Sequence, residues 1–149
     1  MTWRSSLGFS LLELLVVLGI AAATLTLVVP RFVQTLEKAQ FEAAVLEVVS
    51  GLRQARGIAL LQQREATFWI NVEEKHYRVD HYRKRLPSEA LALRIETAEQ
   101  DLTPSGGRIR FFPDGSSTGW RITMVWGKRQ REIDVNWLTG RVVVVRMPE

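Results

Sequence analysis

The chain has 149 residues, of which 46% are hydrophobic and 24% are charged, so its average composition is that of an ordinary folded protein with about one domain. It contains no cysteine, which excludes disulfides, thiolate metal sites and cysteine nucleophiles. Its formal net charge of +4 is too small to indicate nucleic-acid binding by itself.

An apolar run occupies residues 9–29, and its only charged residue is Glu13. A helix of roughly 20 residues crosses the bilayer core, which is about 30 Å thick, so this run predicts a single membrane-spanning helix. Arg4 precedes the run and Arg31 follows it, so the flanking charges give little guidance on orientation.

A secretory signal peptide is the main alternative for this run, because the alanines at 21–23 resemble a cleavage site. The run continues to Val29, however, and is longer than the usual apolar region of about 7–15 residues in a signal peptide. Glu13, four residues into the run, is an unusual residue for a signal peptide. A carboxylate at the centre of a membrane helix costs about 2.5–3.5 kcal/mol, less near an end, and is usually functional. Both features favour a membrane anchor over a signal peptide.

The sequence from Gly8 to Glu13, GFSLLE, resembles the processing motif of type IV pilins and type II secretion pseudopilins. In that family an inner-membrane prepilin peptidase cuts after the glycine and methylates the new amine, and a glutamate stands fifth in the mature chain. The resemblance implies a leader at residues 1–8, cleavage between Gly8 and Phe9, methylation of Phe9 and an assembly role for Glu13. It also implies an inner-membrane assembly platform and other pseudopilins as partners.

The chemistry of Glu13 supports an assembly role without reference to the family. Helices in lipid gain little from apolar contacts with one another, so their register needs a polar contact. The carboxylate of Glu13 on one subunit can pair with the freed Phe9 amine of its neighbour. Removing one member of a buried ion pair typically costs about 3–5 kcal/mol. The alternative is a simple single-pass anchor with an incidental glutamate.

Residues 30–63 predict an amphipathic helix that continues the anchor, and Pro30 leaves open whether the two parts are bent. Its apolar face is expected to cover a sheet, although a groove for a cofactor or partner is an alternative. The apolar residues recur at spacings of three and four: Phe41, Val45, Val48, Leu52, Ala55 and Ala59.

Residues 64–149 predict a β-rich head, because apolar and other residues alternate there in short runs separated by turn signals. Two of these runs are expected to continue to a tryptophan: Trp120, Ile122, Met124 and Trp126, and then Ile133, Val135 and Trp137. Short antiparallel strands covered by one amphipathic helix indicate the α+β class, a long N-terminal helix packed on an antiparallel sheet. The expected core of the head contains six apolar residues: Phe68, Ile70, Trp120, Ile122, Ile133 and Val135.

Two stretches of the head are similar to H-type minor pseudopilins of type II secretion systems. They are residues 110–119, RFFPDGSSTG, and residues 133–142, IDVNWLTGRV. Within the first, Phe112 to Gly115 fits a type I turn, with proline second and glycine fourth. The resemblance implies a structural subunit of the periplasmic pseudopilus, located in the bacterial inner membrane with its head in the periplasm.

The sequence gives little support for an enzyme. Gly115, Ser117 and Gly119 match the G-x-S-x-G pattern of a nucleophile elbow, but a strand is expected after them where that motif needs a helix. The separation of His76 and His81 would place them on opposite faces of one strand. We therefore expect no catalytic residue, no cofactor and no obligatory metal.

Two basic clusters keep a second hypothesis open. Residues 83–85 and 128–131 are rich in Arg and Lys and lie near Tyr82, Trp120 and Trp126. Such surfaces bind nucleic acid, and some minor type IV pilins with this kind of domain take part in DNA uptake. Solvated hairpin tips have the same composition, and we favour that interpretation, without a nucleic-acid partner.

Overall fold

The computed structural model describes residues 9–86, 91–96 and 101–146, and it leaves the side chains of 25–32, 34 and 146 undescribed. The chain divides into two units, Met1–Lys38 and Ala39–Glu149. The predicted leader, residues 1–8, lies outside the described residues.

Helix α1, Leu11–Gln62, contributes to both units. Its backbone continues through Pro30, so the predicted anchor and the amphipathic segment form one helix. Among the side chains that the structure describes, no helix is both long enough and apolar enough to span a membrane. The predicted span, residues 9–29, includes five positions, 25–29, whose side chains lie outside that set.

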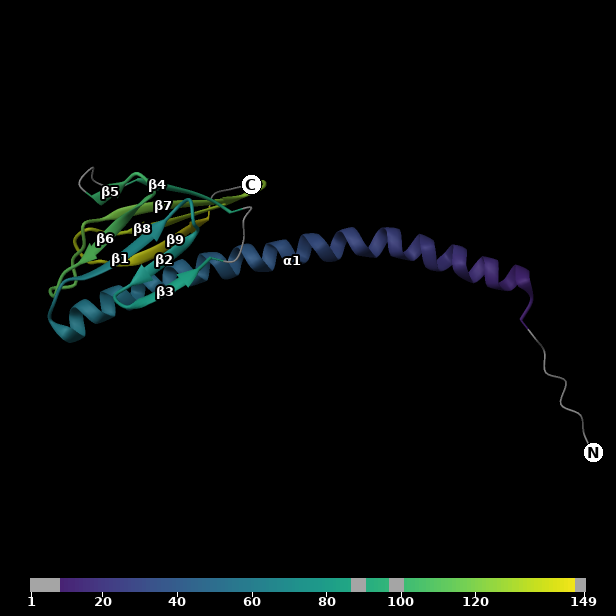
Figure 1. Ribbon diagram of the computed structural model, residues 1–149, viewed down its shortest axis with the longest axis horizontal. Coiled ribbons are helices and arrows are strands. Elements are labelled where there is room, and N and C mark those ends of the chain that lie inside the picture. The colour runs from purple at the N-terminus through teal and green to yellow at the C-terminus, as the bar shows by residue number, and fades with distance from the viewer. Residues whose placement is uncertain (1–8, 87–90, 97–100, 147–149) are drawn as a thin grey trace, which may run out of the picture. The chain divides into compact units, whose positions relative to one another are not determined.

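The second unit contains two antiparallel sheets (Figure 1). In the five-stranded sheet the strand order is β3-β2-β1-β6-β5, so β1 lies between two neighbours that are distant from each other in sequence. Its strands are β1 (Ala66–Asn71), β2 (His76–Val79), β3 (Tyr82–Arg85), β5 (Leu102–Thr103) and β6 (Gly106–Phe111).

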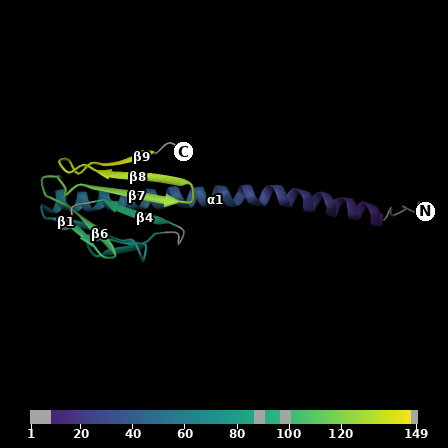
Figure 2. The same cartoon turned by 90° about the horizontal axis from the view of Figure 1, so that it is seen from above.

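The four-stranded sheet has the order β4-β7-β8-β9, which Figure 2 shows side by side. Here β7, β8 and β9 follow one another as hairpins, and Ile133 of β8 lies opposite Ile122 on one side and Val144 on the other. Among the described residues β9 is an edge strand, because it pairs only with β8. The strands are β4 (Ala92–Glu96), β7 (Trp120–Trp126), β8 (Arg129–Val135) and β9 (Val142–Arg146).

The predicted core is confirmed. The helical stripe from Phe41 to Ala59 and the six expected head residues are all buried. Phe41 meets Trp126 of the four-stranded sheet edge to face at 6.4 Å, so the helix covers both sheets. The fold is therefore α+β, with a long helix packed on antiparallel sheets.

Gly51 explains how closely the helix approaches the five-stranded sheet. The rings of Phe68 and Tyr77 stack at 5.3 Å below it. A β-carbon at Gly51 would lie 2.7 Å from the Tyr77 ring and 2.8 Å from the Phe68 ring, closer than packed carbon atoms approach. Gly57, which the sequence also shows within the helix, has open space around it.

Two local expectations were wrong. The alternation of Ile133 and Val135 was expected to continue to Trp137, but β8 ends at Val135 and Trp137 is 65% exposed. The reason is Asn136, whose side-chain oxygen accepts hydrogen bonds from the amides of Leu138 and Thr139 and so starts a turn.

The second error concerns the histidines and the basic cluster at 83–85. His76 and His81 do not share a strand, because the chain turns at Asp80, which has a φ of 52°. The basic cluster is part of strand β3 and not a hairpin tip. Arginine and lysine are tolerated there because β3 is an edge strand whose side chains are exposed.

Candidate functional site

The predicted assembly residues lie where α1 begins. Gly8 lies outside the described residues, Phe9 is 80% exposed, and Glu13 is in the first helical turn. The Glu13 amide donates a hydrogen bond to Ser10 Oγ at 3.1 Å, so Ser10 is the N-cap of the helix. Sequence reasoning missed Ser10, although Ser-x-x-Glu before an apolar run is the capping-box pattern.

The position of Glu13 in the helix stabilises its charged carboxylate even without a partner. A carboxylate in the first turn interacts with the positive end of the helix dipole, typically by 0.3–1 kcal/mol. Among the described residues the Glu13 side chain has no hydrogen-bond or ion-pair partner. The carboxylate is thus open to a cation from outside the described chain.

The two stretches that resemble pseudopilin motifs form loops that contact each other. The first loop closes as predicted by a β-turn, in which the Gly115 amide donates to the Phe112 carbonyl oxygen at 2.9 Å. The Ser117 amide then donates to the Trp137 carbonyl oxygen at 2.8 Å, and Ser117 Oγ donates to the Asn136 carbonyl oxygen at 3.1 Å. Residues 112–119 and 136–141 are therefore joined at one end of the two sheets.

Ser117 has a structural position and not that of an exposed nucleophile. It is 6% exposed, and its hydroxyl also accepts the Gly119 amide at 3.2 Å. Strand β7 follows directly, as the sequence predicted. The neighbouring Asp114 accepts bonds from the hydroxyl and amide of Ser116, which lowers the pKa of the Asp114 carboxyl.

Helix α1 holds the joined loops through Arg56, whose Nε donates to the Thr139 carbonyl oxygen at 3.1 Å. Gly140 makes room for this contact, because it has a φ of 58° and a β-carbon there would lie 3.1 Å from Arg56 Cδ and Nε. The same β-carbon would overlap the Gly115 carbonyl oxygen. Glycine at 140 is thus required by both backbone conformation and close approach.

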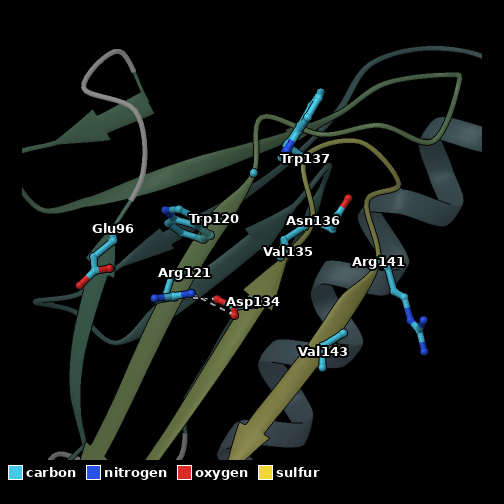
Figure 3. A pocket seen from close by; sticks show the side chains of 10 residues that line it. Glu96, Trp120, Arg121, Asp134, Val135, Asn136, Trp137, Arg141 and Val143 are labelled. Atoms are coloured by element: carbon cyan, nitrogen blue, oxygen red, sulfur yellow. Dashed lines mark hydrogen bonds and ion pairs between the residues drawn. The ribbon is translucent and has the colours of Figure 1, made fainter.

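Beside these loops a hollow of about 650 Å³ lies on the outer side of the four-stranded sheet (Figure 3). Arg121 pairs there with Asp134 at 2.8 Å and with Glu132 at 2.9 Å. The exposed ring of Trp137 stands at one end of the hollow. Because Arg121 is paired with two carboxylates and the ring of Trp137 is exposed, the surface is better suited to contact a protein than to perform chemistry.

The predicted basic clusters do not form one nucleic-acid surface. Trp120 and Trp126, expected beside them, are buried in the core. The clusters lie in different sheets, because 83–85 belongs to β3 and Arg131 belongs to β8. Three of the cations face carboxylates: Arg83 with Glu74 at 3.1 Å, Lys84 with Glu47 at 2.7 Å and Arg131 with Glu42 at 2.6 Å.

The histidines are also separated. His81 is fully exposed, and burial lowers the pKa of His76, with the nearby Arg83 guanidinium adding to the effect. Within the described residues no group of three or more His, Cys, Asp or Glu side chains is placed to hold a metal ion.

The sequence profile of the family described as type II transport protein GspH matches residues 44–140, well over half of the chain and including most of both joined loops. The chain belongs to the type II transport protein GspH family. The predicted resemblance to H-type minor pseudopilins is thereby confirmed.

Among the relatives of this GspH-family chain is type II secretion system protein H of Xanthomonas campestris pv. campestris. The two are 29% identical over 141 residues, which cover 93% of this chain and 83% of the relative.

Solved structures show the same fold at low sequence identity. The type IV minor pilin FimU of Pseudomonas aeruginosa is similar with a TM-score of 0.59 and 13% identity, over 75% of this chain and 91% of that one. The minor pseudopilin EpsH from the type 2 secretion system of Vibrio cholerae is similar with a TM-score of 0.54 and 15% identity, over 72% and 96%.

Proposed function

We propose that this GspH-family chain is a minor pseudopilin, a structural subunit of the periplasmic pseudopilus of a type II secretion system, with no catalytic role. The family match over residues 44–140 carries the proposal. It is supported by a second unit that has a closed core and joins its two motif loops. The relative named type II secretion system protein H gives the same assignment.

The first unit is proposed to anchor the protein in the inner membrane by a single pass, with the second unit in the periplasm. Every described side chain from Phe9 to residue 24 is exposed, and most of them are large and apolar. Soluble proteins rarely expose apolar surface on this scale, so lipid or neighbouring helices must cover it. Residues 1–8 would be the leader that prepilin peptidase removes after Gly8, leaving a methylated Phe9 amine.

Assembly is proposed to depend on Glu13. A mature N-terminus at Phe9 would be a cation, and the open carboxylate of Glu13 on a neighbouring pseudopilin could neutralise it in lipid. The other partners in this proposal are the prepilin peptidase and the inner-membrane assembly platform.

The proposal is tested by deleting the gene and measuring exoprotein secretion and surface piliation in the same strain. Loss of secretion with normal piliation is the expected result. Normal secretion with lost piliation would contradict it and support a minor type IV pilin.

A DNA-binding minor pilin is the second candidate, because one face of the five-stranded sheet combines an aromatic ring with cations. The guanidiniums of Arg78 and Arg108 each lie 5.6 Å from the centre of the Trp69 ring. Arg108 also pairs with the buried Asp101 at 3.0 Å, and an acidic group there would weaken phosphate binding. DNA affinity measured against salt concentration decides, since phosphate contacts produce a steep decrease with salt.

A further inference from the structure

Three arginines line one cavity beside the turn between β8 and β9. Arg53 and Arg56 come from α1, and Arg141 precedes β9. The cavity has a volume of about 370 Å³, and Gly140 and Val142 complete its lining. Figure 3 shows Arg141 pointing away from the Arg121–Asp134 pair. We call this site the arginine pocket.

The arginine pocket differs from the rest of the second unit in its charge balance. None of the described residues that line it is acidic, and among the described residues neither Arg53 nor Arg141 has a carboxylate partner. Most other arginines with a described partner face a carboxylate: Arg64 faces Asp80, Arg83 faces Glu74, Arg108 faces Asp101, Arg121 faces Asp134 and Arg131 faces Glu42. Guanidinium groups stay charged at every physiological pH, so the pocket holds three like charges that an anion would relieve.

One of the three cations is fixed before any ligand binds. Arg56 Nε is held by the Thr139 carbonyl oxygen, and Gly140 leaves the space in which the Arg56 side chain lies. The two terminal nitrogens of Arg56 have no hydrogen-bond partner among the described residues. They remain available for the two-point contact that a guanidinium makes with a carboxylate.

The surroundings of the pocket indicate a protein ligand. Val142 in its wall is the first residue of β9, an edge strand, and Val144 on the same face of that strand is 38% exposed. An edge strand with exposed β-branched residues is a ready surface for another chain. A free inorganic anion would use the cations and leave this apolar extension uncovered.

We propose that the arginine pocket binds a carboxylate side chain of a neighbouring pseudopilin subunit, whose backbone lies along β9. This proposal rests on the proposed function, because it assumes a filament neighbour. The pocket would then fix the contact between second units, separately from Glu13.

The binding test uses the full-length protein in detergent and a fluorescent hexaglutamate peptide. We expect Arg53→Glu combined with Arg141→Glu to weaken peptide binding by about tenfold or more. The control is Arg94→Glu, the same kind of substitution at a single exposed position on the four-stranded sheet, which should leave binding unchanged. Equal binding by the double variant and the wild type would overturn the proposal. The proposal would also be overturned if inorganic phosphate or a single-stranded oligonucleotide bound more strongly than the peptide and the double variant abolished that binding.

A secretion assay separates this proposal from the function on which it rests. If gene deletion leaves secretion intact, the proposed function fails. A second outcome is that deletion abolishes secretion, whereas the double variant secretes as well as Arg94→Glu. If circular dichroism shows that the double variant is folded, only the arginine pocket proposal then fails. The expected result is loss of secretion in the double variant, restored by an acidic-to-basic substitution in another pseudopilin.

Discussion

Helix α1 has two parts that use apolar residues differently. In the first unit, apolar side chains point in all directions and every described one from Phe9 to residue 24 is exposed. In the second unit the apolar stripe from Phe41 to Ala59 recurs at spacings of three and four, and its six residues are all buried. The second unit therefore covers its apolar face with its own sheets, whereas the exposed apolar side chains of the first unit are those proposed above to be covered by lipid or neighbouring helices.

Two glutamates on the same helix repeat this difference. Glu47 accepts a hydrogen bond from the Tyr77 hydroxyl at 2.5 Å and one from Lys84 Nζ at 2.7 Å. Among the described residues the Glu13 side chain has no such partner. The Glu47 carboxylate is thus satisfied within the chain, whereas the Glu13 carboxylate is available for the contact with a neighbouring subunit proposed above.

The largest effect is expected for a substitution in the leader that keeps the protein out of filament assembly. We expect Gly8→Leu to block cleavage, because a branched side chain should not fit the peptidase cleft, so that intact mass shows the leader still attached. Gly19→Leu is the matched control, since Gly19 has open space around it within the helix. In the wild type, a methylated N-terminus at Phe9 is expected. One at Met1 or near Ala23 would contradict the prediction.

Glu13→Ala should still be inserted and cleaved but should assemble poorly, because the neighbour's amine would be left unpaired in lipid at a typical cost of about 3–5 kcal/mol. Crosslinking to filament neighbours and exoprotein secretion measure the effect. Ser10→Ala is the control, because it removes only the helix cap, which costs about 1 kcal/mol. Equal defects in both variants would mean that Glu13 acts through helix capping alone.

In the second unit, substitutions of helical glycines should change the free energy of unfolding through packing within the chain. We expect Gly51→Ala to lower the free energy of unfolding by about 1–3 kcal/mol, since its methyl group would overlap the rings of Phe68 and Tyr77. Gly57→Ala should raise it by up to about 1 kcal/mol, because the space is open and alanine favours the helix. Urea unfolding of a fragment with residues 34–149 measures both. Equal effects of the two substitutions would show that the helix does not approach the sheet this closely.

The smallest effect concerns pH. The hydrogen bond from Lys84, followed by that from Tyr77, lowers the pKa of Glu47 from its ordinary value of 4.5. A lowered pKa means that the stabilisation is present above this value and lost as the pH falls through the folded-state pKa. Glu47→Gln should therefore cost on the order of 1 kcal/mol at neutral pH and progressively less below about pH 4.5. A difference that is constant from neutral to acidic pH would exclude this ion pair as the cause.

The sequence by itself determined the helix, most of the strands and the core. A helix brings every third or fourth residue to one face and a strand brings every second, so the spacing of apolar residues records which side meets the core. That is why the stripe from Phe41 to Ala59 and the alternation from Trp120 to Trp126 were predicted correctly.

Only the tertiary structure decided which polar groups are paired and which loops meet. Arg56 reaches Thr139 across 83 positions of sequence, and Ser117 reaches Asn136 because β7 and β8 lie side by side. Polar contacts of this kind leave no period in the sequence, since each depends on where two separate elements pack. The arginine pocket is therefore visible only after the helix and the β8–β9 turn have been placed together.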